Sequence, residues 1–176
     1  MCASGLLLHN SGMAFEITEK GGPWLLPARR ITRSEEETAA FARELAAGLQ
    51  AGDVLCLSGE LGAGKTAFTR GLVAGLRGDE GSALVKSPTY TILNIYEGTP
   101  PIHHFDFYRV ENAGDITALG LDDYWAKGIS IVEWPKSFCY SLPGRIINVT
   151  FEITGQNERT VEVGAPHDNQ NVLSRA

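Results

Sequence analysis

The sequence predicts an α/β fold with three layers, in which helices cover both faces of a mixed, partly parallel sheet. Three observations lead to this prediction. A short apolar run at residues 54–57 is followed by a glycine-rich loop and then by a helical stretch at residues 67–76. Further apolar or alternating runs recur along the chain, with a second helical stretch between them. Two pairs of such runs are separated only by turn residues, which is typical of antiparallel hairpins.

The helices are predicted from capping residues and from hydrophobic spacing. Ser34 followed three residues later by Glu37 reads as a capping box, and apolar residues then recur at helical spacing as far as Leu49. Residues 67–76 form the helix after the glycine-rich loop, and residues 113–127 are helical in character. The core contacts expected from that last segment are Ile116, Leu119, Tyr124 and Trp125.

The strands are predicted from short runs of β-forming residues bounded by turn signals. Residues 54–57 are expected to form a buried central strand that contains Cys56. The other predicted strands are residues 90–96 and 102–108, which form one hairpin, residues 129–134, and residues 145–153 and 160–163, which form a C-terminal hairpin.

Length and composition fit a single globular domain. Of 176 residues, 43% are hydrophobic and 20% are charged, which is typical of soluble proteins with a sizeable core. The net charge of −6 argues against broad, charge-driven binding to nucleic acid, because such binding needs a basic face. No apolar run approaches the roughly eighteen residues that cross a membrane. The three cysteines show no metal-ligand spacing, so we expect reduced thiols in a cytoplasmic protein.

The domain is expected to occupy residues 31–165. Residues 1–30 contain several Gly and Pro residues without sustained periodicity. We interpret them as an N-terminal extension that is partly disordered or lies over the domain. Residues 166–176 are polar and are expected to form a flexible tail.

The glycine-rich loop carries the strongest chemical signal. Residues 59–66 read Gly-Glu-Leu-Gly-Ala-Gly-Lys-Thr and match the pattern G-x-x-x-x-G-K-[ST] completely. Backbone N–H groups of such a loop point at a polyphosphate, and the following helix N-terminus adds partial positive charge. We expect Lys65 to reach the terminal phosphates and the Thr66 hydroxyl to bind Mg²⁺. The sequence therefore predicts a phosphate-loop (P-loop) nucleotide-binding fold with a triphosphate site.

Two acidic residues follow strands where a second half of the site is expected. Asp106 follows residues 102–105 and Glu133 follows residues 129–132, where strand ends are expected, and ligands of open α/β sheets gather at the carboxyl ends of strands. Spacing alone does not decide which of the two holds Mg²⁺. His103 and His104 are adjacent, so on a strand they face opposite sides. We interpret Trp134 as a core residue.

The chain resembles the TsaE (YjeE) family, bacterial ATPases needed to make threonylcarbamoyladenosine in tRNA. The resemblance covers roughly residues 31–163 and rests on five segments in the family's order and spacing. These segments are residues 59–66 (GELGAGKT), 86–91 (KSPTYT), 104–109 (HFDFYR), 120–124 (GLDDY) and 132–135 (VEWP).

The resemblance assigns roles to the candidate residues. It implies that Glu133 is the second metal-site residue beside Thr66, that Asp106 lies near the γ-phosphate and positions water, and that residues 87–89 form a switch-like segment. It also implies nucleotide contacts for Glu35, near the base or ribose, and for Arg159, in the last hairpin. The phosphates would be wrapped by Leu61, Gly62, Ala63, Gly64, Lys65 and Thr66.

The activity implied is Mg²⁺-dependent ATP hydrolysis, slow alone, serving a complex of TsaB and TsaD with threonylcarbamoyl-adenylate supplied by TsaC. The tRNA would be reached through these partners. One alternative is a small-molecule kinase of the nucleoside type, although no segment concentrates the Arg and Gly of a kinase lid. A second is a nucleotide-sensing interaction module, which uses the same site. A GTPase would need the guanine-binding motif Asn-Lys-x-Asp, which does not occur in the sequence.

Overall fold

The computed structural model describes residues 6–8, 14–17, 23–24, 28–164 and 167–168. The strands are β1 (Leu6–Leu8), β2 (Ala14–Ile17), β3 (Pro23–Trp24), β4 (Ala28–Thr32), β5 (Asp53–Ser58), β6 (Leu93–Tyr96), β7 (Ile102–Asp106), β8 (Ile129–Glu133), β9 (Arg145–Ile153), β10 (Arg159–Val163) and β11 (His167–Asp168). The α-helices are α1 (Glu35–Ala46), α2 (Lys65–Arg77), α3 (Asp79–Ser82) and α4 (Ala113–Ala118), and the 3-10 helices are η1 (Leu121–Tyr124) and η2 (Ser137–Ser141).

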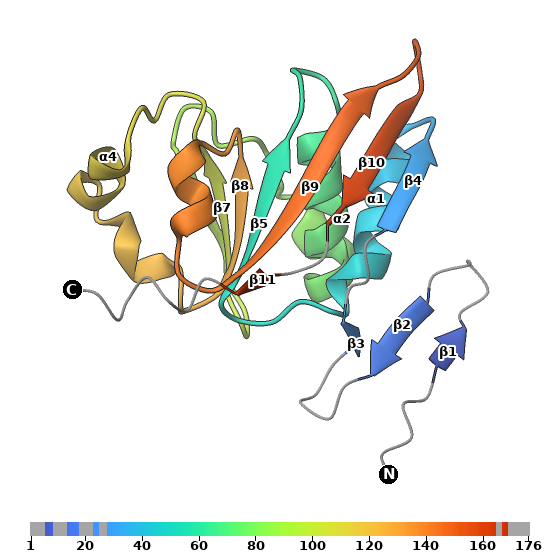
Figure 1. Ribbon diagram of the computed structural model, residues 1–176, viewed down its shortest axis with the longest axis horizontal. Helices are drawn as coiled ribbons and strands as arrows, with labels where there is room; N and C mark the ends of the chain where they lie inside the picture. Colours follow the sequence, from blue (N-terminus) through green and yellow to red (C-terminus); the bar gives the residue numbers. More distant parts are fainter. Residues whose placement is uncertain (1–5, 9–13, 18–22, 25–27, 165–166, 169–176) are drawn as a thin grey trace.

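The main sheet is mixed, as predicted. Its strands follow the order β4-β10-β9-β5-β8-β7-β6, and β11 pairs with β9. The central strands β9, β5, β8 and β7 are parallel to one another. Strand β6 pairs antiparallel with β7, and β10 pairs antiparallel with both β9 and β4. The predicted hairpins are therefore present at both sides of a parallel centre (Figure 1).

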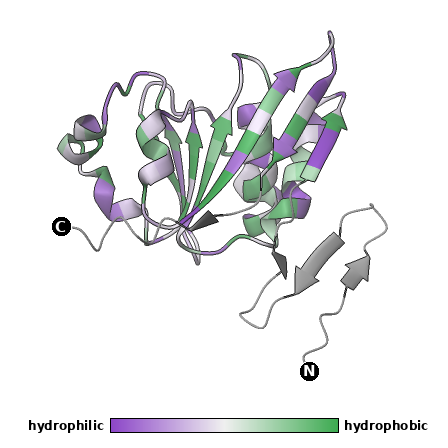
Figure 2. Cartoon of the chain, viewed as in Figure 1, coloured by the Kyte–Doolittle hydropathy of each residue, from purple (hydrophilic) through white to green (hydrophobic). Residues whose placement is uncertain are grey.

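Two apolar clusters on opposite faces of the sheet make the three layers. One face packs against α1 and α2 and contributes Leu55, Leu57, Ile131 and Val149 to the first cluster. The other face packs against α4, η1 and η2, and the second cluster contains Cys56, Phe105, Val132, Ile116, Trp125 and Cys139. Figure 2 shows that β5 is largely apolar, whereas hydrophilic bands interrupt β4, β9 and β10. A strand buried on both faces is expected to be apolar along its length, as β5 is.

Helices α1 and α2 approach closely because α2 presents glycine to α1. A Cβ atom at Gly71 would lie 2.1 Å from the carbonyl oxygen of Ala39, and one at Gly75 would lie 2.4 Å from Cβ of Ala46. The rings of Phe41 and Phe68 then meet edge to face, with centroids 6.3 Å apart. This packing holds α2 closely against α1.

The N-terminal boundary of the domain differs from the prediction. The main sheet already includes Ala28, because β4 pairs with β10 along its whole length. The sequence predicts a start at residue 31. Strands β1, β2 and β3 form a separate three-stranded antiparallel sheet. The remaining residues of the predicted extension 1–30 and most of the predicted tail 166–176 lie outside the described residues.

Three local predictions are corrected by the structure. The helix predicted over residues 113–127 is interrupted at Gly120, which adopts a left-handed backbone conformation with φ 68°. Leu119 consequently points outward and is 51% exposed, although we expected it in the core.

The strand predicted from residue 90 begins at Leu93, after a turn. At the start of α1, Ser34 accepts from the Glu37 backbone N–H, but the Glu37 carboxylate accepts from Arg33 instead of closing the capping box.

No helix in the described part of the chain is long and apolar enough to cross a membrane.

Candidate functional site

The predicted site residues gather at one edge of the sheet. The strands β5, β7 and β8 are parallel and end at the same edge of the sheet (Figure 1). The glycine-rich loop follows β5, Asp106 is the last residue of β7, and Glu133 is the last residue of β8. Asp106 and Glu133 are register partners on neighbouring strands, and each is only 3% exposed. The strand order, which local sequence patterns do not give, is what makes these two acids neighbours.

The glycine-rich loop follows β5 and leads directly into α2. Gly59 lies so close to β9 that a Cβ atom there would be 2.7 Å from the carbonyl oxygen of Phe151. Gly64 has a φ of 105°, a conformation that side chains rarely allow, and it precedes the first residue of α2. The thirteen-residue helix α2 thus directs its N-terminus at the loop, an arrangement that favours an anion.

Lys65 is enclosed within the loop rather than open to solvent. Its Nζ atom donates to the carbonyl oxygens of Gly59 and Glu60, both at 2.8 Å, and the side chain is 4% exposed. Burial lowers the pKa of Lys65 below its ordinary value, while the carboxylates of Glu133 and Asp106 act in the opposite direction.

Trp134 covers this lysine. The Lys65 ammonium lies 3.9 Å from the centre of the Trp134 ring, within the range of a cation–π interaction. Trp134 is half-buried and has a φ of 57°, a conformation that is unusual for a bulky residue and that tends to cluster at active sites and ligand-binding segments. Its ring also meets that of Tyr108, with centroids 5.3 Å apart. Our interpretation of Trp134 as a core residue is therefore wrong.

Thr66 and Glu133 meet across the loop. The Thr66 hydroxyl donates to Oε1 of Glu133 at 3.0 Å and lies 3.3 Å from Oε2. A hydroxyl and a carboxylate are hard oxygen ligands of the kind that Mg²⁺ prefers, and Mg²⁺ in nucleotide sites commonly uses one or two carboxylates together with phosphate oxygens. No group of three or more His, Cys, Asp or Glu side chains in the described residues is arranged to hold a metal by itself. The donor set therefore fits a Mg²⁺ ion that arrives with a nucleotide.

Asp106 is held by the segment of residues 87–89. Its Oδ2 atom accepts from the Thr89 hydroxyl at 2.8 Å and from the Ser87 hydroxyl at 3.2 Å. Its Oδ1 atom accepts from the Tyr108 backbone N–H at 2.9 Å. The structure thus joins the predicted switch-like segment to the predicted water-positioning acid.

Glu35 and Arg159 lie at the same end of the sheet but outside this network. Glu35 begins α1, and its exposed carboxylate is 3.5 Å from Arg70. Arg159 begins β10 and is the register partner of Thr32 on β4. The Thr32 hydroxyl lies 2.8 Å from the Thr38 hydroxyl. Thr38 in turn lies beside Gly64 of the loop, because it is the nearest neighbour of a Cβ atom built there. Arg159 is half-buried. Both residues therefore flank the loop without touching the Lys65, Thr66, Asp106 and Glu133 side chains through a described contact.

Two further residues, which the sequence does not single out, lie at the site. His104 is fully buried and its Nε2 atom lies 2.9 Å from Oε1 of Glu133. Tyr96 lies on the other side of the ring, with its hydroxyl 3.3 Å from Nδ1. The predicted alternation of His103 and His104 is confirmed, because His103 instead faces Tyr124, with ring centroids 4.9 Å apart. Alternation along a strand predicts which face of the sheet a side chain occupies, but not which other side chain it contacts there.

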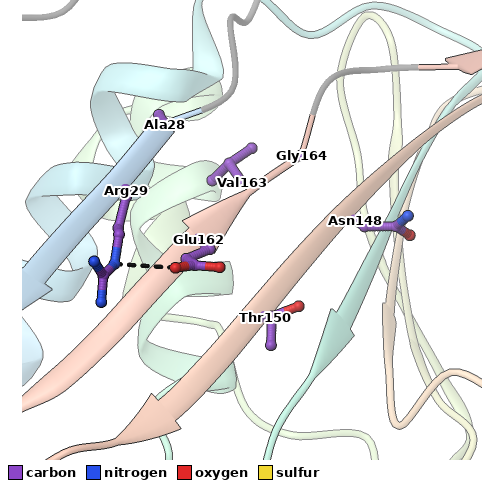
Figure 3. A pocket seen from close by; sticks show the side chains of 7 residues that line it. All are labelled: Ala28, Arg29, Asn148, Thr150, Glu162, Val163 and Gly164. Carbon is purple, nitrogen blue, oxygen red and sulfur yellow. Dashed lines mark ion pairs between the residues drawn. The ribbon is translucent and has the colours of Figure 1, made fainter.

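A pocket elsewhere on the sheet has a different character. It has a volume of about 350 Å³ and lies on β4, β10 and β9, on the face turned away from α1 and α2 (Figure 3). Within it, Arg29 and Glu162 pair with each other at 3.0 Å, so their charges offset each other. None of the predicted site residues lines it. We therefore place the candidate site at the glycine-rich loop.

Comparison with known proteins adds three findings. The family model described as "Threonylcarbamoyl adenosine biosynthesis protein TsaE" matches residues 32–161. The tRNA threonylcarbamoyladenosine biosynthesis protein TsaE of Bacillus subtilis is 38% identical over 144 residues, covering 81% of this chain and 88% of the relative. The protein of the same name from Rickettsia bellii is 33% identical over 141 residues, covering 79% of this chain and 96% of the relative.

A solved structure is also similar to this chain. The crystal structure of Bacillus subtilis YdiB superposes with a TM-score of 0.62 at 34% sequence identity. The match covers 79% of this chain and 85% of that chain. The residues that the family model matches contain the glycine-rich loop and both strand-end acids.

Proposed function

Because this chain belongs to the TsaE family, which takes part in tRNA threonylcarbamoyladenosine biosynthesis, we propose that it is a Mg²⁺-dependent ATP hydrolase required for this modification. The hydrolysis is slow in the isolated protein and is stimulated by partner proteins. The names of the TsaE relatives state the tRNA modification. The phosphate-binding chemistry of the glycine-rich loop supports a nucleotide as the substrate.

The observation that carries the proposal is the contact between Thr66 and Glu133. These residues are separated by 67 positions in the sequence, yet their side chains meet at 3.0 Å at the N-terminus of α2. A phosphate-loop hydroxyl beside a strand-end carboxylate is the pair that holds Mg²⁺ in nucleotide hydrolases of this class. When bound, Mg²⁺ would neutralise negative charge on the phosphates. Thr66 and Glu133 would hold it.

The other residues of the site have roles that follow from their chemistry. The backbone from Leu61 to Gly64 and the α2 N-terminus bind the phosphates, and Lys65 supplies the charge for the terminal ones. Lys65 is already held by two loop carbonyls, so its ammonium is oriented before the nucleotide arrives. Asp106, held by Thr89 and Ser87, positions the attacking water.

Glu35 and Arg159 complete the proposal at the nucleoside end. Glu35 is the first residue of α1, the helix that packs against α2, and its exposed carboxylate is only loosely held by Arg70. Arg159 lies beyond Thr32 on the neighbouring strand. We assign Glu35 to the base or ribose and Arg159 to the nucleotide.

The partners proposed are the TsaB–TsaD pair, through which the protein acts on tRNA in the cytoplasm. The net charge of −6 supports an indirect route, because binding tRNA directly calls for a basic surface. TsaC supplies the threonylcarbamoyl-adenylate that the partners use.

The experiment that tests the activity is a turnover assay on the purified full chain. It compares ATP with and without Mg²⁺, with and without the TsaB–TsaD pair, and with water or nucleosides as the phosphate acceptor. We expect phosphate release that requires Mg²⁺ and rises with the pair. Phosphorylation of an added nucleoside would instead identify a kinase, and ATP binding without any phosphate release would identify a nucleotide-sensing module.

A further inference from the structure

The Glu133 carboxylate is held from two sides. On one side the Thr66 hydroxyl donates to Oε1 at 3.0 Å. On the other side the His104 ring contacts the same oxygen through Nε2 at 2.9 Å. Thr66 is half-buried and lies in the first turn of α2, whereas His104 is completely buried within β7. The histidine is therefore the partner that comes from the sheet.

The hydrogen-bond pattern determines which nitrogen of the His104 ring carries a proton. An ionised carboxylate only accepts hydrogen bonds, so Nε2 must carry a proton to bond Oε1. In the neutral ring, Nδ1 is then an acceptor, and the Tyr96 hydroxyl at 3.3 Å is a donor placed to satisfy it. The chain of donors runs from Tyr96 through His104 to Glu133. It crosses three neighbouring strands, β6, β7 and β8.

We propose that His104 is a positioning residue that orients the Glu133 carboxylate for the metal ion, and that Tyr96 in turn fixes the His104 ring. This inference rests on the proposed function, because it needs a metal ion at Glu133. Groups that hydrogen-bond a metal ligand orient it, and their loss commonly weakens metal binding by about 10- to 100-fold. His104 touches neither the loop backbone nor Lys65 in any described contact, so its effect passes through Glu133.

The neighbouring residue His103 offers a matched control. It is also buried, it lies on the same strand, and it is only 3% exposed. Its ring faces the opposite side of the sheet, against Tyr124. Replacing His103 therefore disturbs a buried aromatic contact at the same depth without touching Glu133. A purely structural effect of losing a buried imidazole would appear in both replacements.

The experiment measures metal affinity directly, independently of turnover. Mn²⁺ replaces Mg²⁺ and is titrated by electron paramagnetic resonance into the full chain saturated with a non-hydrolysable ATP analogue. The variants are His104→Phe, His104→Gln, Tyr96→Phe and His103→Phe. We expect His104→Phe to weaken Mn²⁺ binding by about 10- to 100-fold. His104→Gln, which retains an N–H donor, should recover part of this loss.

The remaining variants separate positioning from folding. Tyr96→Phe removes only one hydroxyl at a half-buried position and should weaken Mn²⁺ binding by about 2- to 10-fold. His103→Phe should bind Mn²⁺ as the unmodified protein does. The analogue should bind all variants equally in the presence of a metal chelator, because the loop is intact. If His104→Phe fails to fold, Tyr96→Phe carries the test.

Several results would overturn the inference. Unchanged Mn²⁺ affinity in a folded His104→Phe, or in Tyr96→Phe when His104→Phe does not fold, would remove His104 from the site. Equal losses in His103→Phe and His104→Phe would reduce the effect to core packing. Failure of the proposed function looks different: the unmodified protein would bind Mn²⁺ with the analogue yet release no phosphate from ATP. Absence of Mn²⁺ binding to the unmodified protein would reject both.

Discussion

The Thr89 hydroxyl donates a hydrogen bond of 2.8 Å to Oδ2 of Asp106, across 17 positions of sequence. Ser87 lies 3.2 Å from the same oxygen, and the Ser87 and Thr89 hydroxyls are 2.9 Å apart. The segment of residues 87–89 is therefore tied to a buried acid at the end of β7. A γ-phosphate beside Asp106 would compete for these hydroxyls, which gives the segment two alternative sets of contacts.

The first prediction concerns Asp106. In Asp106→Asn the side chain keeps its shape but loses the charge that orients water, so turnover should fall by about 10²-fold or more. ATP should remain bound with nearly normal affinity, because the loop backbone and Lys65 hold the phosphates. Paired calorimetric and turnover measurements check this, with Asp122→Asn on the exposed η1 as the control. Near-normal turnover would mean that another group positions the water.

The second prediction concerns Lys65. Lys65→Ala removes the ammonium that the loop holds in place, so triphosphate affinity should fall at least about tenfold and hydrolysis should be lost. Lys127→Ala, on an exposed lysine paired with Asp123, is the control and should bind ATP normally. Calorimetric titration measures the affinity, and circular dichroism checks the fold. An unchanged affinity for ATP in Lys65→Ala rules out the phosphate-loop assignment.

The third prediction uses Trp134 as a reporter. Its ring lies over the Lys65 ammonium, and phosphate binding should draw that cation away from its present contact. Trp134 fluorescence should therefore change when ATP and Mg²⁺ bind. Trp24 and Trp125 are replaced by Phe to isolate the signal, and a protein that retains Trp125 alone serves as the reference. A Trp134 signal that stays constant at saturating ATP would place this strand end away from the nucleotide.

The sequence predicted the elements that depend on local pattern. The bounds of β9 agree with the prediction, and the helix after the glycine-rich loop extends the predicted segment by a turn or less at each end. These succeed because hydrophobic period and the loop pattern are local signals. The prediction that Leu119 lies in the core was wrong because Gly120 breaks the helix and shifts the period of the residues around it.

The candidate site can be predicted from the sequence only where a motif marks it. The loop and the two strand-end acids stand out because each has a fixed position relative to a strand. His104 and Tyr96 could not be connected to Glu133 from the sequence, since their contact depends on β6, β7 and β8 lying side by side. The enclosure of Lys65 by Trp134 likewise depends on a backbone conformation, φ 57°, that no pattern in the sequence indicates.

The fourth prediction concerns the packing of α1 against α2. Alanine is normally better than glycine inside a helix by about 1 kcal/mol. Gly71→Ala should nevertheless destabilise the protein by about 1–3 kcal/mol, because the added methyl group meets the Ala39 backbone. Urea denaturation measures the change in the free energy of unfolding. An increase in stability would show that the two helices do not approach as closely as Gly71 and Ala39 indicate.

The central claim is that ATP bound at this loop serves the tRNA modification. It is tested most directly by mass spectrometry of digested tRNA from cells depleted of the protein. The account predicts tRNA that lacks threonylcarbamoyladenosine, full recovery when the unmodified protein is restored, and no recovery with Lys65→Ala. Full modification in depleted cells that carry no second copy of the gene would contradict the account, even if every residue of the site bound ATP as proposed.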